Sequence, residues 1–250
     1  MAEIEVAVSQ GVQTVRFNRA GKKNAITRAM YKAMADAVSG ADTSDDIRVT
    51  VFLGQPEVFT SGNDLADFMA VATGGEKGTE VIDFLRAIIG GKKPLLAAVD
   101  GLAVGVGCTM LMHCDMVFAS HRAWLQTPFV DLGLVPEAGS SLIAPRIMGH
   151  QRAFQLLAMG DRFNAEEAHA AGLVNEVVET EHLEARAMDA AARLAAKPPE
   201  ALAMSRALTR GDRKDVMARM EEEGALFGER LLSDEARNAF MSFMNRAKAS

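Results

Sequence analysis

The sequence has few of the residues that mark specialised protein classes. Its 250 residues include 2 cysteines, Cys108 and Cys114, and both stand among apolar residues, where free thiols usually belong to the core. A disulfide framework is therefore not supported. Aromatic residues make up 6% of the chain, and no stretch reaches the roughly 18 consecutive apolar residues that a membrane-spanning helix needs.

An excess of positive charge is also absent. The chain carries 27 Lys and Arg against 33 Asp and Glu, a formal net charge of −6, which argues against nucleic-acid binding. The first residues lack the basic and apolar segments of a secretory signal, and the last residues are not a Ser-Lys-Leu address. We therefore expect a soluble, cytoplasmic protein that binds neither nucleic acid nor membrane.

Strand and helix patterns alternate over most of the chain, which predicts an α/β core. Gln10-Gly11 predicts a hairpin turn. The predicted strands are residues 3–8, 12–17, 48–53, 95–99 and 116–119. The predicted helices are residues 27–39, 80–89 and 105–113, and residues 54–63 are expected to form a loop. Beyond about residue 198 the pattern is helical throughout, so we expect a core of residues 1–197 and a helical region of residues 198–250.

Three loops present groups that could bind a ligand. The turn at residues 18–25 carries Arg19, Lys22 and Lys23, which could meet phosphate groups, although a solvated turn is the alternative. In residues 58–65, small residues precede a helix N-cap, and free amides of that turn could bind an oxyanion. Residues 101–109 lead from a strand into a helix whose first amides lack partners.

Three other kinds of chemistry fit the sequence poorly. Met110 stands where a dinucleotide-binding fingerprint would have its third glycine. The spacing of Cys108, His113, Cys114 and Asp115 matches no common zinc site, so we expect no metal. Ser140-Ser141 lies outside a Gly-x-Ser-x-Gly motif, and helix capping is the better interpretation of this pair.

Glu137 is the candidate catalytic carboxylate. It directly follows Pro136 in a stretch that also contains Phe129, Leu132 and Leu134. One interpretation is a first-turn helix acid, which would stabilise the helix by about 0.3–1 kcal/mol. The other is a general base, because an apolar setting raises the pKa of a carboxyl group toward neutral pH.

Taken together and in order, these segments resemble the crotonase superfamily, which includes enoyl-CoA hydratases and isomerases. The resemblance covers nearly the whole chain and rests on residues 18–25, 59–65, 101–107, 114–115 and 160–174. It implies an α/β fold, a spiral of ββα turns with an acyl-CoA site in residues 1–197. Residues 198–250 would trimerise, giving a homotrimer or a dimer of trimers. No cofactor is implied, because coenzyme A is part of the substrate.

The resemblance also implies roles for individual residues. The thioester oxygen would lie between the backbone N–H groups of Asn63 and Val106, and Glu137 would be the base. Further substrate contacts would come from Lys22, Lys23, Ala25, Ser61, Gly62, Asp64, Leu65, Gly105, Phe129, Leu132 and Leu134.

The superfamily's hydratases use two glutamates, and this chain has Thr109 and Phe129 in their places. Neither side chain can act as an acid or base. Glu137 instead matches the base of 3,2-trans-enoyl-CoA isomerases of the peroxisomal type. The resemblance therefore implies conversion of 3-enoyl-CoA to 2-trans-enoyl-CoA through a dienolate. Hydration, thioester hydrolysis and a non-catalytic acyl-CoA-binding role are the alternatives, and acyl chain length stays open.

Overall fold

The computed structural model describes residues 2–72 and 78–249 and contains two sheets. The strands of the six-stranded sheet are, in spatial order, β1 (Ile4–Ser9), β2 (Val12–Phe17), β3 (Val49–Leu53), β5 (Leu95–Val99), β7 (Met116–Ser120) and β10 (Glu176–Val178). Those of the four-stranded sheet are β4 (Val58–Thr60), β6 (Leu102–Val104), β8 (Trp124–Gln126) and β9 (Phe163–Asn164). The pairs β1–β2 and β8–β9 are antiparallel, and the other pairs are parallel.

The chain moves between the two sheets in a repeating order. Each of β3, β5 and β7 lies in the large sheet, and the strand that follows it, β4, β6 or β8, lies in the small one. Every residue of β3 and β5 is buried, as expected for central parallel strands that are covered on both faces. The expected α/β spiral is therefore confirmed.

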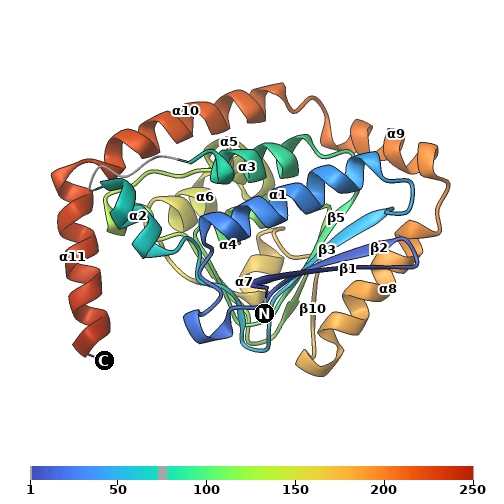
Figure 1. The fold of residues 1–250 in the computed structure, drawn as a ribbon, viewed down its shortest axis with the longest axis horizontal. Helices are drawn as coiled ribbons and strands as arrows, with labels where there is room; N and C mark the ends of the chain where they lie inside the picture. Colours follow the sequence, from blue (N-terminus) through green and yellow to red (C-terminus); the bar gives the residue numbers. More distant parts are fainter. Residues whose placement is uncertain (1, 73–77, 250) are drawn as a thin grey trace.

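Helices cover both faces of the large sheet (Figure 1). On one face α1 (Arg28–Thr43) packs against α3 (Glu80–Gly90), and α8 (Leu183–Ala195) covers the other face. The buried residues of α8 include Ala187, Ala190 and Ala191, whose small side chains let this helix lie close to the strands. The large sheet separates the main core from a smaller core under α8.

Short helices occupy many of the connections between the strands and the longer helices. They are η1 (Ala20–Lys22), α2 (Leu65–Ala72), α4 (Val106–Thr109), η2 (Met110–His113), η3 (Val130–Leu132), α5 (Ser140–Met148), α6 (His150–Leu157), α7 (Ala165–Ala170) and η4 (Thr180–His182). None of the described helices is both long and apolar enough to cross a membrane.

The last part of the chain is helical, as predicted, and consists of α9 (Pro199–Arg210), α10 (Lys214–Leu231) and α11 (Asp234–Ala249). In Figure 1 these helices run along the top of the molecule and down one side. The Arg206 side chain of α9 pairs with Asp115 at 2.7 Å, and α10 packs against α3 and α5. The C-terminal helices thus contact the core within the same chain.

The structure corrects three local predictions. The expected loop at residues 54–63 contains β4, and the expected helix at residues 105–113 is divided into α4 and η2. Ser140 and Ser141 do not cap α5, because its N-cap is Gly139 and no side chain of that residue is available to accept a hydrogen bond. The hydroxyl of Ser140 is buried without a partner among the described residues.

Candidate active site

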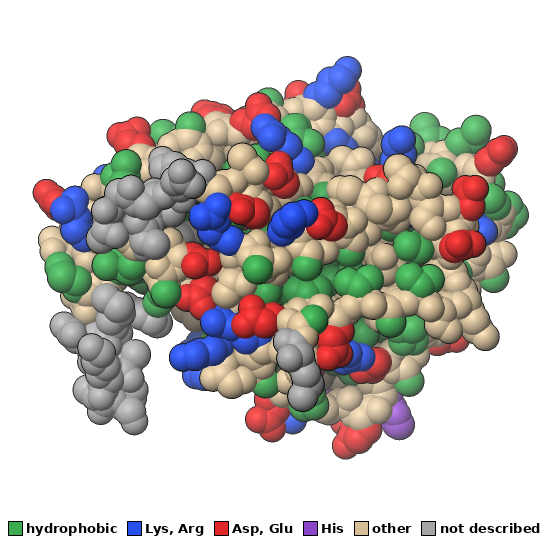
Figure 2. Space-filling model, in the orientation of Figure 1, with side chains coloured by type: hydrophobic (Ala, Val, Ile, Leu, Met, Phe, Trp, Pro, Cys, Tyr) green, Lys and Arg blue, Asp and Glu red, His purple; other side chains and the backbone are tan. Residues whose placement is uncertain are grey.

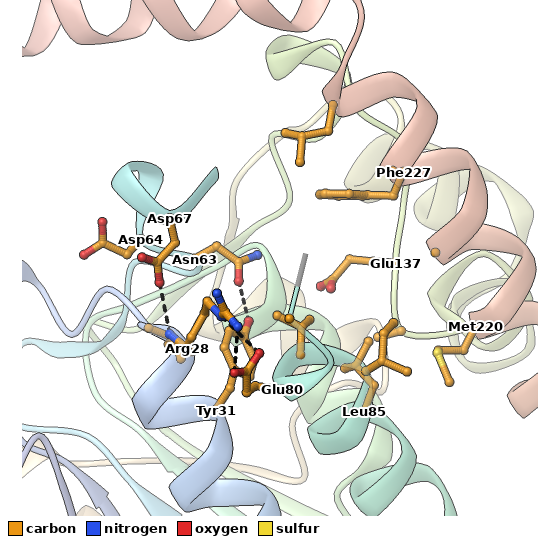
Figure 3. Close-up of a pocket in the computed structure, with 18 residues that line it drawn as sticks. Arg28, Tyr31, Asn63, Asp64, Asp67, Glu80, Leu85, Glu137, Met220 and Phe227 are labelled. Carbon is orange, nitrogen blue, oxygen red and sulfur yellow. Dashed lines mark hydrogen bonds and ion pairs between the residues drawn. The ribbon is translucent and has the colours of Figure 1, made fainter. Parts of the chain in front are cut away.

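A cavity of about 200 Å³ lies between α1, α3 and α10, next to the loop that precedes α2 (Figure 3). One wall is apolar and comes from two helices, with Val81, Ile82 and Leu85 on α3 and Met220, Phe227 and Leu231 on α10. Polar side chains from α1, the start of α3 and the loop before α2 line the opposite side, and Glu137 faces the space between them. The cavity therefore offers both apolar surface and a few polar groups, as small-molecule sites commonly do.

Glu137 lies in the loop between η3 and α5, and its carboxylate points into the cavity on the side of Asn63 (Figure 3). The side chain is 6% exposed. Burial raises the pKa of Glu137 to about 7, although the Thr109 hydroxyl, which donates to Oε1 at 2.8 Å, opposes the rise. The negative charge of Glu223 raises it further. A carboxyl group with this pKa can accept and release a proton near neutral pH.

The other carboxylates of the cavity are held by cationic or amide groups. Arg28 donates two hydrogen bonds to Glu80, at 2.9 and 3.0 Å, and these lower the pKa of Glu80. The backbone N–H of Arg28 donates to Asp67 at 3.0 Å. Burial alone would raise the pKa of Asp64, but hydrogen bonds, chiefly from Arg19 at 2.7 Å, lower it. Glu137 differs from all three because its hydrogen-bond partner is a neutral hydroxyl group.

Two loops bring the predicted oxyanion donors to neighbouring positions. An added Cβ atom on Gly62 would lie 2.7 Å from the carbonyl oxygen of Val104. The two loops can therefore approach this closely only because residue 62 has no side chain. Gly105 has φ +58° and is the N-cap of α4, which begins at Val106. Within the described part of the chain, the backbone N–H groups of Asn63 and Val106 have no hydrogen-bond acceptor. Both groups are therefore available to a ligand.

Tyr31 holds the first of these loops. Its hydroxyl donates to Oδ1 of Asn63 at 2.5 Å, and the Tyr31 side chain is buried in the main core. On the backbone, Ile26 N–H donates to Gly62 and Asp64 N–H donates to Ile26. Sequence reasoning missed Tyr31, because an aromatic residue on a predicted helix is more often a core residue than a partner of a functional loop.

The basic turn at residues 18–25 is docked beside the same loop. The Ser61 N–H donates to the carbonyl of Lys23 at 2.9 Å, and Arg19 reaches both Asp64 and the carbonyl of Ala25. The side chains of Lys22 and Lys23 are exposed. Figure 2 shows Lys and Arg side chains beside the place that this turn occupies in Figure 1. The structure therefore brings Lys22, Lys23, Ala25 and Ser61 together next to the cavity, though they do not line it.

The remaining predicted contacts divide into two groups. Asn63, Asp64 and Glu137 line the cavity, whereas Val106, Gly62, Gly105 and Leu65 lie in or next to the two adjoining loops. Asp64 also caps α2, because its Oδ1 accepts from the N–H of Ala66 at 2.9 Å.

The apolar residues expected around Glu137 do not line the cavity. Phe129 lies behind Phe227, with the ring centroids 6.5 Å apart in an edge-to-face contact. Leu134 is buried in the main core, and Leu132 is half-buried against it. The apolar wall comes from α3 and α10 instead. The sequence contains a signal for this wall, since Met220 and Phe227 belong to an apolar stripe on α10. An apolar stripe predicts that one face of a helix is buried, but it does not identify the surface that this face contacts.

Among residues 2–72 and 78–249, no three His, Cys, Asp or Glu side chains lie close enough to hold a metal ion. Cys108 is instead buried among apolar side chains, and His113 is buried between the carbonyl of Ala138 and the guanidinium of Arg213. Burial raises the pKa of the Cys108 thiol to about 12, so this sulfur stays protonated at neutral pH.

Comparison with known proteins relates the chain to acyl-CoA enzymes. Residues 7–250 match the protein family described as enoyl-CoA hydratase/isomerase. The chain is 40% identical to enoyl-CoA delta isomerase 2 of Rattus norvegicus over 249 residues, which cover 97% of this chain but 63% of the rat protein. It is 35% identical to peroxisomal enoyl-CoA delta isomerase 3 of Mus musculus, and the match covers 99% of this chain and 80% of the mouse protein.

Solved structures agree with the sequence comparison. An enoyl-CoA hydratase/isomerase from Pseudoalteromonas atlantica T6c superposes with a TM-score of 0.93 at 39% identity, and the match covers 98% of each chain. The chain thus matches that bacterial protein over nearly its full length, whereas it spans less than two thirds of the rat isomerase.

Proposed function

Since the chain belongs to the enoyl-CoA hydratase/isomerase family, we propose that it is an enoyl-CoA isomerase that converts a 3-enoyl-CoA into 2-trans-enoyl-CoA. The observation that carries this proposal is the environment of Glu137. It is a buried carboxylate with a pKa of about 7, and it faces a cavity in which the other carboxylates are held by Arg or amide groups. The relatives named enoyl-CoA delta isomerase support the same reaction.

In the proposed reaction Glu137 takes a proton from C2 of the substrate. The electron pair of that C–H bond moves toward the thioester carbonyl, which gives a dienolate with negative charge on oxygen. The N–H groups of Asn63 and Val106 stabilise this charge, and each such donor contributes roughly 3 kcal/mol. Protonated Glu137 then returns the proton to C4. One carboxyl group suffices, because no water is added and the proton count is unchanged.

The contact of Glu137 with Thr109 argues against hydration. Hydration needs one group that activates water and another that protonates the α-carbon. Thr109 lies on α4 and donates to Glu137 at 2.8 Å, and a hydroxyl group of ordinary pKa cannot replace a second carboxyl group in this role. Isomerisation by a single proton shuttle therefore fits the site better than hydration.

We further propose that the acyl chain lies along the apolar wall between α3 and α10, and that coenzyme A lies toward the basic turn. Leu85, Met220 and Phe227 give the chain a dry surface, and each buried methylene group contributes about 0.8 kcal/mol. Lys22 and Lys23 are exposed on the opposite side of the Asn63 loop, where they can meet the phosphates.

A paired assay tests the proposed reaction. Purified protein is incubated separately with a 3-enoyl-CoA and with a 2-enoyl-CoA, and the products are separated by chromatography. We expect the first substrate to give 2-trans-enoyl-CoA. If 3-hydroxyacyl-CoA or free coenzyme A forms instead, the protein is a hydratase or a thioesterase and the proposal fails.

The Glu137→Gln variant tests the role of the carboxyl group. Gln keeps the size and the hydrogen bond with Thr109 but cannot accept the α-proton. We expect kcat to fall by about 10²–10⁴-fold while binding of the CoA ester is kept. Near-normal turnover in this variant would remove Glu137 from the proposed role. Binding without turnover or α-proton exchange in the wild type would indicate a non-catalytic acyl-CoA-binding protein.

A further inference from the structure

The loop that carries Glu137 has a backbone conformation that needs support from outside the loop. Ala138 has φ +64° and Gly139 has φ +69°, both in the left-handed region. A residue with a Cβ atom rarely adopts this region, and it persists where surrounding contacts fix it. The neighbours of residues 137–141 therefore decide where the carboxylate of Glu137 lies.

Glu223 on α10 supplies the first of these contacts. Its Oε2 accepts from the N–H of Gly139 at 2.5 Å, and its Oε1 accepts from the N–H of Ser141 at 2.9 Å. Glu223 is 4% exposed and so meets these amides away from water. It takes the part of an N-cap for α5, whose own N-cap residue is a glycine. A helix distant in sequence thus fixes the backbone two residues beyond Glu137.

His113 supplies the second contact. Its Nε2 lies 2.7 Å from the carbonyl oxygen of Ala138, and its Nδ1 lies 3.0 Å from the guanidinium of Arg213, which directly precedes α10. A carbonyl can only accept and a guanidinium can only donate, so the imidazole is neutral with its proton on Nε2. Burial, which lowers the pKa of His113 to about 3, agrees with this state. Arg213 therefore fixes the ring that holds Ala138.

We propose that Glu223 and His113 are positioning residues that hold the loop of Glu137 against α10. The inference rests on the proposed role of Glu137 as the base. Neither residue lines the cavity, so each acts through the backbone of the loop. Two of these contacts hold the same peptide group, the one that joins Ala138 to Gly139, because His113 binds its carbonyl oxygen and Glu223 binds its N–H. Because both reach α10 or the residue before it, this helix supports the base as well as lining the cavity.

The charge of Glu223 gives the proposal a measurable signature. The groups that face Glu137 from the packed elements are Tyr31 on α1, Cys108 and Thr109 on α4, and Glu223 on α10. Burial raises the pKa of both Tyr31 and Cys108, so these two are neutral in the assay range. Glu223 accepts a hydrogen bond at each oxygen, as an ionised carboxylate does. Removing its charge should therefore make Glu137 easier to ionise.

Glu223 itself faces charged and polar groups from two elements. Burial raises its pKa, whereas the Ser141 hydroxyl, the amides of Ser141 and Gly139 and the charge of Arg219 oppose the rise. Arg219 also donates to the hydroxyl of Ser141 at 3.1 Å and pairs with Glu222. A variant of Glu223 therefore needs a control elsewhere on α10 that leaves these contacts intact. Glu229 is exposed on the same helix and provides it.

The test compares the variants Glu223→Gln, Glu223→Asp and Glu229→Gln with the wild type. Two quantities are measured for each, the pH dependence of kcat/KM and the value of kcat. The concentration of folded sites used to calculate kcat is determined from CoA-ester binding. Gln removes the charge and can accept only one of the two N–H bonds. We expect kcat to fall by roughly 10- to 100-fold and KM to stay within about threefold of the wild-type value. The acidic limb of the pH profile of kcat/KM should move to lower pH. Asp keeps the charge but is one methylene shorter. We expect a kcat loss with the limb unmoved. Glu229→Gln should match the wild type.

The outcomes separate this inference from the proposed function. Wild-type kcat and an unmoved limb in both Glu223 variants would mean that Glu223 is a structural residue alone, and the inference would be overturned. If Glu223→Gln cannot be obtained folded, the kcat of Glu223→Asp decides. Glu137→Gln is assayed in parallel. An active Glu137→Gln protein would overturn the proposed function, whereas an inactive one beside normal Glu223 variants would overturn the positioning role.

Discussion

At the scale of single residues, the chemistry of Glu137 depends on two opposing effects. Burial favours the neutral acid, and the hydrogen bond from Thr109 favours the carboxylate. Because burial prevails, the pKa of Glu137 rises to about 7 and does not stay near that of an exposed glutamate. The base must be ionised to take a proton, so kcat/KM of the wild type should rise with pH through about 7 and then level off.

Thr109 provides the first prediction. Thr109→Val replaces the hydroxyl with a methyl group of similar size and removes the bond that lowers the pKa of Glu137. We expect the acidic limb of kcat/KM to move to higher pH. Thr109→Ser keeps the hydroxyl and should keep the limb near its wild-type position. Identical profiles for the two variants would show that this hydrogen bond does not tune the base.

The stability of the fold should also depend on Glu137. A glutamate in the unfolded chain ionises near pH 4.3, whereas Glu137 in the folded chain ionises near pH 7. Between these values the folded chain binds more protons than the unfolded chain, so stability falls as pH rises through this window. Glu137→Gln removes that loss. We expect its free energy of unfolding in urea to exceed the wild-type value by roughly 1–3 kcal/mol at pH 8.

The excess should shrink as the pH approaches 5, where Glu137 is protonated in the folded state. Glu229→Gln, an exposed change of the same chemistry, should show no such pH dependence. A Glu137→Gln protein that is less stable than the wild type at pH 8 would contradict this prediction. It would show that hydrogen bonds stabilise the ionised Glu137 side chain in the folded chain by more than burial destabilises it.

At the scale of elements, α10 is the helix whose role is broadest. Its inner face lines the cavity with Met220 and Phe227, and Glu223, one turn after Met220, caps α5. Gly224 also faces the cavity, and an added Cβ atom there would lie 3.6 Å from Cδ1 of Ile82 on α3. A glycine inside a helix costs about 1 kcal/mol relative to alanine. The open space at this position is what the glycine provides.

Substitutions of Gly224 test that interpretation. Gly224→Ala should fit, because its Cβ atom would make an ordinary contact, and we expect it to stabilise the fold by up to about 1 kcal/mol in urea denaturation. Gly224→Leu should fill the space between α3 and α10. In assays with a series of 3-enoyl-CoA esters, we expect its kcat/KM to fall at least tenfold more for long acyl chains than for short ones. An equal fall for all chain lengths would place the acyl chain elsewhere.

Some elements could be predicted from the sequence more easily than others. The strands β3, β5 and β7 consist mostly of apolar residues, because both faces of the parallel sheet are covered, and their predicted bounds agree with the structure within one residue. The strand β4 was missed because it has three residues between polar turns. The break between α4 and η2 was missed for a different reason, since a 3-10 turn continues the same apolar pattern.

At the scale of the whole molecule, the two most exposed large apolar side chains among the residues with described burial lie on α9. Leu208 is 83% exposed and Met204 is 67% exposed, both on the side of α9 away from the core. Large apolar side chains in such positions are typical of surfaces that contact another chain. They agree with the prediction that residues 198–250 mediate assembly, which the single chain does not test.

Light scattering after size-exclusion chromatography would test the assembly. We expect the wild type to have the mass of three or six chains. Leu208→Glu should shift the protein toward smaller species, because the charge would lose its water on assembly. Leu208→Met keeps the apolar surface and should keep the wild-type mass. A wild-type protein with the mass of one chain would contradict the prediction.

The candidate site could be predicted in part, and the limit is one of distance along the chain. Glu137 and the two amide loops were identified because each is a local pattern of small residues, turns or an isolated carboxylate. Glu223 contacts the loop of Glu137 from a position 84 residues after Gly139, and His113 contacts Ala138 from 25 residues before it. No local pattern links residues so far apart, and a carboxylate on a charged helix is usually solvated.

The capping of α5 by Glu223 also has a consequence for synthesis of the protein. A ribosome releases the chain from its N-terminus onward, and the spiral of ββα turns can begin to fold before α10 has emerged. Until then the amides of Gly139 and Ser141 lack the carboxylate that holds them in the finished chain. The nascent spiral would already contain Glu137 in a loop that is not yet locked. Turnover would then begin only after α10 has emerged from the ribosome and packed against the spiral.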